Sequence, residues 1–221
     1  MNTKNIVRIL LSLVLVFGFS SAWAAQTIKW SMQGDSLTLD PHAQNEGPTT
    51  QVSRQVYEAL VQRGLDMKIG PALATSWKAT DPNTWVFQLR KDAKFSDGSG
   101  MTSADVVFSI LRAKQRTSDF KEYISTVSNV EAVGDYAVKI TTSKPNPILL
   151  NQLSNIFIMS KAWSEKNFAM SPQNWDAGQE TFSATNALGT GPFKITLREP
   201  NTKTVFKRNK HWWGEMDDNG L

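Results

Sequence analysis

The sequence predicts a mixed α/β fold in which strands and helices follow no regular βαβ order. Three observations carry this prediction. Residues 84–90 alternate aromatic or leucine side chains with others, as a half-buried strand does. Residues 49–63 repeat apolar side chains at helical spacing. Residues 127–142 contain two strand-like stretches on either side of a glycine-aspartate pair, which is typical of a hairpin turn.

The predicted N-terminal elements are separated by residues that are typical of loops and helix ends. Residues 26–32 alternate in part and predict an early strand, whereas residues 34–48 are rich in Gly, Pro, Asp and Asn and predict a long loop. The helix predicted over 49–63 has a threonine at its start and Gly64 after its end. The strand over 84–90 then leads into a sharp turn at residues 94–100.

A second helix is predicted from Thr102, because Asp105 follows at the spacing of a capping box. Its expected apolar face consists of Val106, Val107, Ile110 and Leu111. The remaining elements are weaker: after the 127–142 hairpin we expect a short helix, a buried strand, a long connecting loop and a last hairpin, at residues 147–155, 157–159, 171–188 and 193–207.

The composition is that of a globular protein and excludes several kinds of chemistry. Of 221 residues, 20% are charged and 40% hydrophobic, so a packed core is expected. Cysteine is absent, which excludes thiol nucleophiles, cysteine-ligated metals, disulfides and a cysteine-linked lipid anchor. Eight Trp and eleven Phe supply many large apolar side chains, for packing or for stacking on a ligand.

Residues 1–24 have the pattern of a secretory signal peptide. Lys4 and Arg8 precede an apolar run over 9–19, and Ala22-Trp23-Ala24 offers a small-residue cleavage site. The sequence therefore predicts export, cleavage after Ala24 or Ala25, and a periplasmic protein over residues 25–221. Without the two basic residues, 22 Lys and Arg face 20 Asp and Glu, a balance of +2 that does not favour nucleic-acid binding.

The sequence shows no enzymatic signature. The two histidines, His42 and His211, have no second histidine or acidic spacing typical of a metal site, and we expect each to lie in a loop or at the surface. No Gly-x-Ser-x-Gly elbow and no dinucleotide or phosphate loop occurs. We therefore expect no catalytic residue, no metal and no cofactor. A glycosidase that uses two carboxylates is the enzymatic alternative, although no pair of acids is marked by its spacing.

Seven stretches in order resemble the N-terminal part of the extracellular solute-binding proteins of the peptide-binding family, which serve ABC importers of dipeptides, oligopeptides and nickel complexes. The stretches are residues 36–42, 56–60, 71–77, 85–98, 102–109, 189–194 and 209–214. The resemblance implies a two-lobed, type II periplasmic-binding-protein-like α/β fold, of which the chain holds about the first lobe with its inserted subdomain. It also implies a peptide or other small solute as ligand and an ABC permease in the inner membrane as partner.

The family resemblance places the ligand cleft beside the loop that follows the first strand. Backbone groups there can pair with an extended peptide as an added strand. The expected ligand-binding residues are Met32, Gln33, Asp35 and Ser36. For Asp35, a role as a turn former is an equal alternative.

Family members are more than twice as long, so we expect a truncated receptor in which the second lobe and the C-terminal return segment are absent. Closure around a ligand needs two lobes, and weak peptide binding by the 221-residue chain is the expected result. The alternative is a split module that associates with a separately encoded second lobe or with itself. The particular solute, the permease and the residues that recognise the ligand termini are not indicated by the sequence.

Overall fold

The computed structural model describes residues 27–215 and divides the chain into two units, residues 1–32 and residues 33–221. In the first unit, residues 27–32 form neither helix nor strand, so the predicted strand over 26–32 is wrong for the part that is described. The predicted signal peptide lies outside the described residues. The helices and strands described below belong to the second unit.

The main sheet of the second unit has four antiparallel strands in the order β3-β4-β6-β5. In its centre Phe87 pairs with Val138, and Trp85 pairs with Ile140. The β5–β6 hairpin turns at Gly134, whose φ of 65° is easy for glycine, as the Gly-Asp pair predicted. The strands are β3 (Ala74–Asp81), β4 (Thr84–Leu89), β5 (Val127–Ala132) and β6 (Ala137–Thr142).

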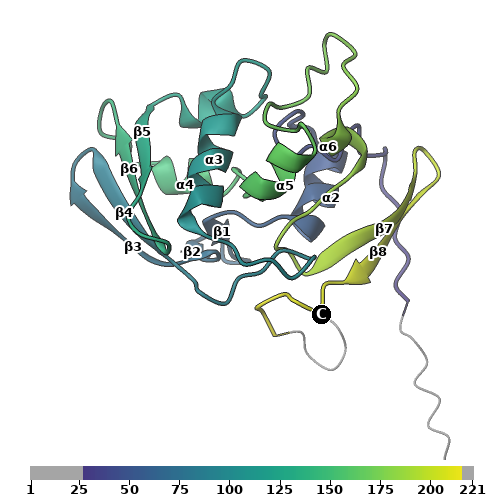
Figure 1. Ribbon diagram of the computed structural model, residues 1–221, viewed down its shortest axis with the longest axis horizontal. Helices are drawn as coiled ribbons and strands as arrows, with labels where there is room; N and C mark the ends of the chain where they lie inside the picture. The colour runs from purple at the N-terminus through teal and green to yellow at the C-terminus, as the bar shows by residue number, and fades with distance from the viewer. Residues whose placement is uncertain (1–26, 216–221) are drawn as a thin grey trace, which may run out of the picture. The chain divides into compact units, whose positions relative to one another are not determined.

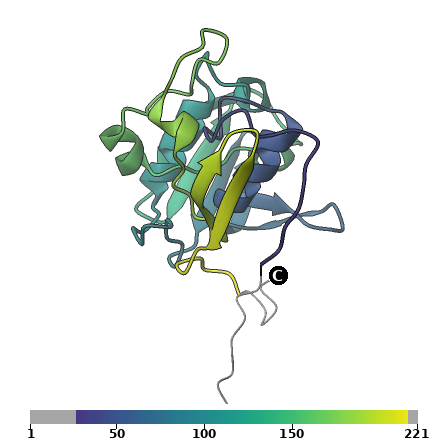
Figure 2. The same ribbon diagram turned by 90° about the vertical axis from the view of Figure 1, so that its right-hand side faces the viewer.

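Two further hairpins complete the β structure (Figure 1). β1 (Val61–Arg63) pairs with β2 (Ile69–Pro71), and β7 (Phe193–Glu199) pairs with β8 (Lys203–Arg208). The β7–β8 hairpin lies alongside α2 (Gly47–Val56) in both views of the ribbon (Figure 2).

Helix α2 is shorter than predicted. It ends at Val56 and is capped by Glu46, whose carboxylate accepts the N–H of Thr49 at 3.0 Å, so the predicted threonine cap is wrong. The chain then continues into β1. The apolar spacing that extends to residue 63 in the sequence is therefore shared between a helix and a strand.

Helix α3 (Ser103–Ala113) starts where predicted and packs on the main sheet (Figure 1). The Asp105 carboxylate accepts the N–H of Thr102 at 2.8 Å, which is one half of a capping box. The predicted face is wrong in part, because Leu111 is 50% exposed while Phe108 is buried. The short helices are η1 (Lys121–Ile124), α4 (Leu149–Leu153), α5 (Lys161–Lys166) and α6 (Phe182–Thr185).

Two hydrophobic clusters hold these elements together. The larger one lies between α3 and the main sheet and includes Phe87, Ile110 and Ile140. The smaller one joins the end of α2 to the β7–β8 hairpin through Tyr57, Phe157 and their neighbours. The second cluster fixes the hairpin beside the segment that carries the predicted ligand-binding residues.

Candidate ligand-binding segment

The predicted site residues differ in their exposure. Met32 belongs to the first unit and is half-buried. In the second unit Gln33 is exposed, Asp35 is half-buried and Ser36 is buried. Three of the four predicted residues thus occupy one loop, residues 33–38, of the second unit.

The half-buried Asp35 carboxylate is held by hydrogen bonds from other parts of the protein. It accepts hydrogen bonds from Arg198 of β7 at 3.2 Å, from the backbone N–H of Asn201 at 2.7 Å and from the N–H of Ser36 at 2.8 Å. Partial burial opposes ionisation of Asp35, but the Asn201 N–H and the Arg198 charge outweigh it and lower its pKa. Asp35 is therefore a carboxylate that ties the loop to the turn of the β7–β8 hairpin.

Ser36 is also engaged by the fold. Its hydroxyl donates to the carbonyl of Thr38 at 2.6 Å, and its own carbonyl accepts a hydrogen bond from Arg198. The next residue, Leu37, donates its N–H to the Thr49 hydroxyl at 2.9 Å. The loop is thus anchored on one side by the hairpin and on the other by the first turn of α2.

Backbone groups remain available at the start of the loop. Within residues 27–215, the N–H and C=O groups of Gln33 and Gly34 make no hydrogen bond to protein. The Gln33 side chain is exposed beside them. An anchored loop with free backbone donors and acceptors has the properties that pairing with an extended peptide requires.

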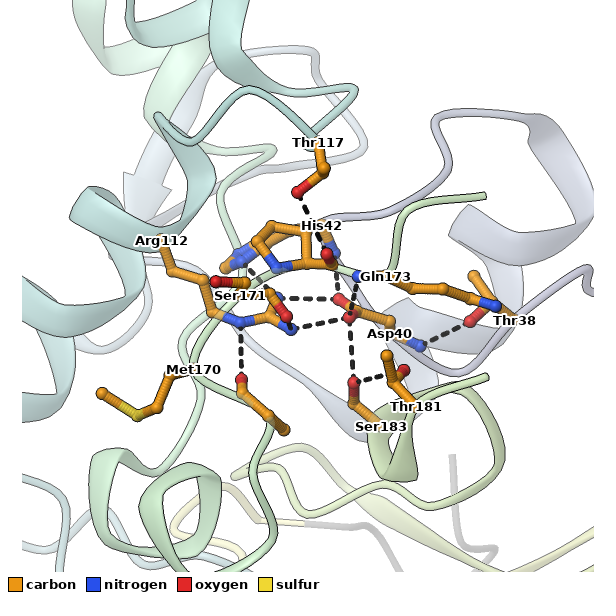
Figure 3. A network of polar contacts seen from close by, with 12 residues as sticks. Thr38, Asp40, His42, Arg112, Thr117, Met170, Ser171, Gln173, Thr181 and Ser183 are labelled. Atoms are coloured by element: carbon orange, nitrogen blue, oxygen red, sulfur yellow. Dashed lines mark hydrogen bonds and ion pairs between the residues drawn. The ribbon is translucent and has the colours of Figure 1, made fainter. Parts of the chain in front are cut away.

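A buried ion pair involves Asp40, which follows this loop by two residues in the chain (Figure 3). Asp40 and Arg112 are fully buried, and the guanidinium Nη2 is 2.6 Å from the carboxylate Oδ2. The same carboxylate accepts the N–H of Gln173 at 3.0 Å and the Ser183 hydroxyl at 2.9 Å. Burial opposes ionisation of Asp40, yet Arg112 outweighs it and lowers the pKa of this carboxyl to about 2.

His42 also belongs to the buried network. It lies in a turn, which fits one of the two predicted locations, but the predicted surface location is wrong. It is fully buried, its Nδ1 lies 3.1 Å from Nη1 of Arg112, and its Nε2 lies 2.9 Å from the carbonyl of Phe157. Arginine can only donate and a carbonyl can only accept, so the ring is neutral with its proton on Nε2. Burial, then the Arg112 charge, lowers the pKa of His42 to about 3. His211, in contrast, is half-buried.

The network joins four distant parts of the chain. Arg112 also donates to the carbonyls of Ala169 at 3.0 Å and Ser171 at 2.9 Å, which fixes the long connection before α6. Sequence analysis did not identify Arg112 as important. The available signal was a charged side chain four residues after Phe108, at helical spacing from an apolar residue and therefore on the buried side, where a charge requires a partner.

A second polar cluster closes the C-terminal part of the unit. Glu58 accepts the indole N–H groups of Trp212 at 3.2 Å and Trp213 at 3.0 Å. The guanidinium of Arg90 lies 3.1 Å from the ring centroid of Trp213, a cation–π contact. Burial raises the pKa of Glu58, although both indoles oppose this effect. Trp212 and Trp213, which lie within the 209–214 stretch of the family resemblance, thus contribute to packing.

The described residues show neither a metal-binding cluster nor a membrane-spanning helix. Among residues 27–215, no group of three or more His, Asp or Glu side chains is arranged to hold a metal ion. The helices in this described part are all too short or too polar to cross a bilayer.

The chain matches a known protein family over most of its length. The family model for bacterial extracellular solute-binding proteins, family 5 (middle part), matches residues 68–220. Among curated proteins, the chain is 26% identical to the periplasmic murein peptide-binding protein MppA of Escherichia coli K12, over 95% of this chain and 43% of that protein. It is 30% identical to the probable D,D-dipeptide-binding periplasmic protein DdpA of the same organism, over 93% of this chain and 40% of that protein.

Solved structures agree with this match. AgaA from A. tumefaciens R10, in complex with agropinic acid, gives a TM-score of 0.73 at 28% identity, over 82% of this chain and 35% of that chain. DppA from Helicobacter pylori, in complex with the peptide STSA, gives 0.71 at 25% identity, over 82% and 39%.

The predicted periplasmic-binding-protein-like α/β fold is confirmed by these neighbours. The chain spans about two fifths of the length of the curated relatives it matches. The family model covers more than half of the chain, and the relatives and the fold agree with it. The chain therefore belongs to the bacterial extracellular solute-binding proteins of family 5.

Proposed function

We propose that this chain forms part of the periplasmic substrate-binding component of an ABC importer, and that its ligand is a peptide or a similar small solute. The family match supports the class of function. The names of the relatives favour peptides, while the complex of AgaA with agropinic acid makes other small solutes the alternative. An inner-membrane permease is the partner that this role requires.

The observation that carries the proposal is the anchored loop with free backbone groups at Gln33 and Gly34. We assign ligand contact to the backbone of this loop and to the exposed Gln33 side chain. Asp35 and Ser36, which hold the loop in place, act as positioning residues. The role of Met32 rests on the family resemblance alone.

Binding follows a simple physical scheme. The loop adds the peptide as a strand, and closure of a second lobe excludes water from the ligand. Since the chain spans about two fifths of its relatives, we expect the 221-residue chain to bind peptides weakly, without the contribution of closure.

The test is a titration of the isotope-labelled chain with a pool of short peptides, followed by NMR. We expect shifts at residues 33–37, their loss in Gln33→Pro, which removes the N–H, and their retention with weaker binding in Gln33→Ala, which removes only the side-chain contact. Shifts confined to other parts of the chain, or equal binding by both variants, would refute the assignment of the site. A submicromolar dissociation constant would refute the prediction of weak binding.

A further inference from the structure

Two arginines meet beside α4, at a distance in sequence from the ligand-binding loop. Arg54, in the last turn of α2, donates from Nη2 to the side-chain oxygen of Asn155 at 3.2 Å. Arg63, at the end of β1, donates from Nη2 to the side-chain oxygen of Asn151 at 2.9 Å. The two asparagines are themselves joined, because Nδ2 of Asn155 donates to the carbonyl of Asn151 at 3.0 Å. Both guanidinium groups are thus held at one turn of chain.

The charges of this pair are not compensated by the protein. Arg90, Arg112 and Arg198 each have a carboxylate oxygen within 3.2 Å. Among residues 27–215, by contrast, no ion pair involves Arg54 or Arg63, whose partners are neutral amide oxygens.

Arg54 and Arg63 are both exposed, so an anion in solution can reach them, and the surroundings of Arg54 favour its binding. The guanidinium carbon of Arg54 lies 5.7 Å from the ring centroid of the buried Phe157, a contact that removes part of its hydration. Partial burial, and next the nearby charge of Arg63, lowers the pKa of Arg54. A bound anion would relieve both effects.

Hydrogen-bond donors remain free at the same place. A guanidinium group has five N–H donors, and one from each arginine is used in the contacts above. In the described part of the chain, the side-chain NH₂ of Asn151 makes no hydrogen bond. The free donors therefore come from three residues on three elements, α2, β1 and α4.

We propose that Arg54, Arg63 and Asn151 form a binding site for an oxyanion, a phosphate or carboxylate group carried by a small molecule. The planar fork of arginine matches both groups and binds them through two parallel N–H···O bonds. None of these three residues belongs to the loop at Gln33. Anion binding at this site can therefore be tested independently of peptide binding at the loop.

The experiment titrates the purified chain with inorganic phosphate and, separately, with succinate, at constant ionic strength. NMR follows the Nε–H signals of the arginines and the side-chain amide of Asn151. We expect saturable shifts of these signals with at least one of the two anions. Saturation by phosphate alone would assign a phosphate ligand, and saturation by succinate would assign a carboxylate ligand.

The test variant combines Arg54→Gln with Arg63→Gln. The control is Arg116→Gln, which removes the charge of an exposed arginine outside the proposed site. We expect the double variant to bind at least tenfold more weakly and the control to bind like the wild type. If loss of the Phe157 contact unfolds the double variant, Arg63→Gln and Asn151→Ala carry the same test. Linear shifts spread over all basic residues, or equal binding by the double variant, would overturn the proposal.

Discussion

Replacement of Asp40 by Asn tests whether the buried ion pair stabilises the fold next to the ligand-binding loop. Oδ2 of Asp40 receives three donors, from Arg112 at 2.6 Å, Ser183 at 2.9 Å and Gln173 at 3.0 Å. Oδ1 receives Arg112 at 2.7 Å and the N–H of His42 at 3.0 Å. Asn has almost the same shape, but its NH₂ group can accept none of the donors at the oxygen that it replaces.

The expected loss of stability is large, because the change leaves the fully buried guanidinium of Arg112 without a counter-charge. Removal of one partner of a buried ion pair costs about 3–5 kcal/mol. A domain of this kind has a total stability of about 5–15 kcal/mol, so the variant should lose about a fifth of it or more.

The assay is urea denaturation at pH 7, followed by circular dichroism and analysed by linear extrapolation. The control is Asp92→Asn, which removes an exposed partner of Arg90 and should cost about 0–1 kcal/mol. A second control combines Asp40→Asn with Arg112→Met, and its cost should be smaller than the sum of the single changes. The reasoning is refuted if Asp40→Asn costs no more than Asp92→Asn.

Two further predictions concern acid stability and a close backbone contact. Because the pKa of His42 falls from 6.5 to about 3 on folding, the unfolded chain binds more protons between these values. The contribution of His42 to the free energy of unfolding should therefore decrease on acidification from about pH 6.5 to about pH 3, by at most about 1.4 kcal/mol per pH unit, and His42→Gln should remove this contribution. A Cβ atom at Gly189 would lie 2.0 Å from the carbonyl oxygen of Val56, so Gly189→Ala should lower the melting temperature by several degrees or prevent folding. Gly100→Ala, which meets nothing within 4 Å, is the control, and equal melting temperatures would contradict the contact.

Elements with local signals were predicted well from the sequence. The start of α3 depends on Thr102 and Asp105, three residues apart, and the β5–β6 turn depends on Gly134 and its neighbour. The β7–β8 hairpin was also confirmed. In each case the signal and the structure lie within one turn of chain, so no distant contact was needed to recognise them.

Elements defined by distant partners were missed or misplaced. β3 was not predicted, because most of its residues are exposed and its burial does not alternate. β1 and β2 have three residues each, too few for a periodic pattern, and their pairing ends the helix that apolar spacing alone would extend to Arg63. The predicted strand over 157–159 is in fact a single bridge between Phe157 and Ala59.

The pairing of residues within the buried network was also beyond prediction. Asp40 and Arg112 are 72 residues apart, and the partners from the 169–183 segment lie in a region without periodicity. His42 follows Asp40 by two residues in the sequence, which gives no indication of its burial. The loop at Gln33, in contrast, was selected through the family resemblance, and its role as the ligand-binding segment stays a prediction.

Mass spectrometry of the protein isolated from its host, under native and denaturing conditions, tests the central claim most directly. The claim is that the chain acts in the periplasm as a receptor for peptides or similar solutes. We predict that the protein is found in the periplasmic fraction, that its sequence begins at Ala25 or Gln26, and that under native conditions it takes up a short peptide supplied in excess and releases it on denaturation. A protein that stays in the cytoplasm with its first 24 residues intact, or one that neither carries nor takes up any small solute, would contradict the account.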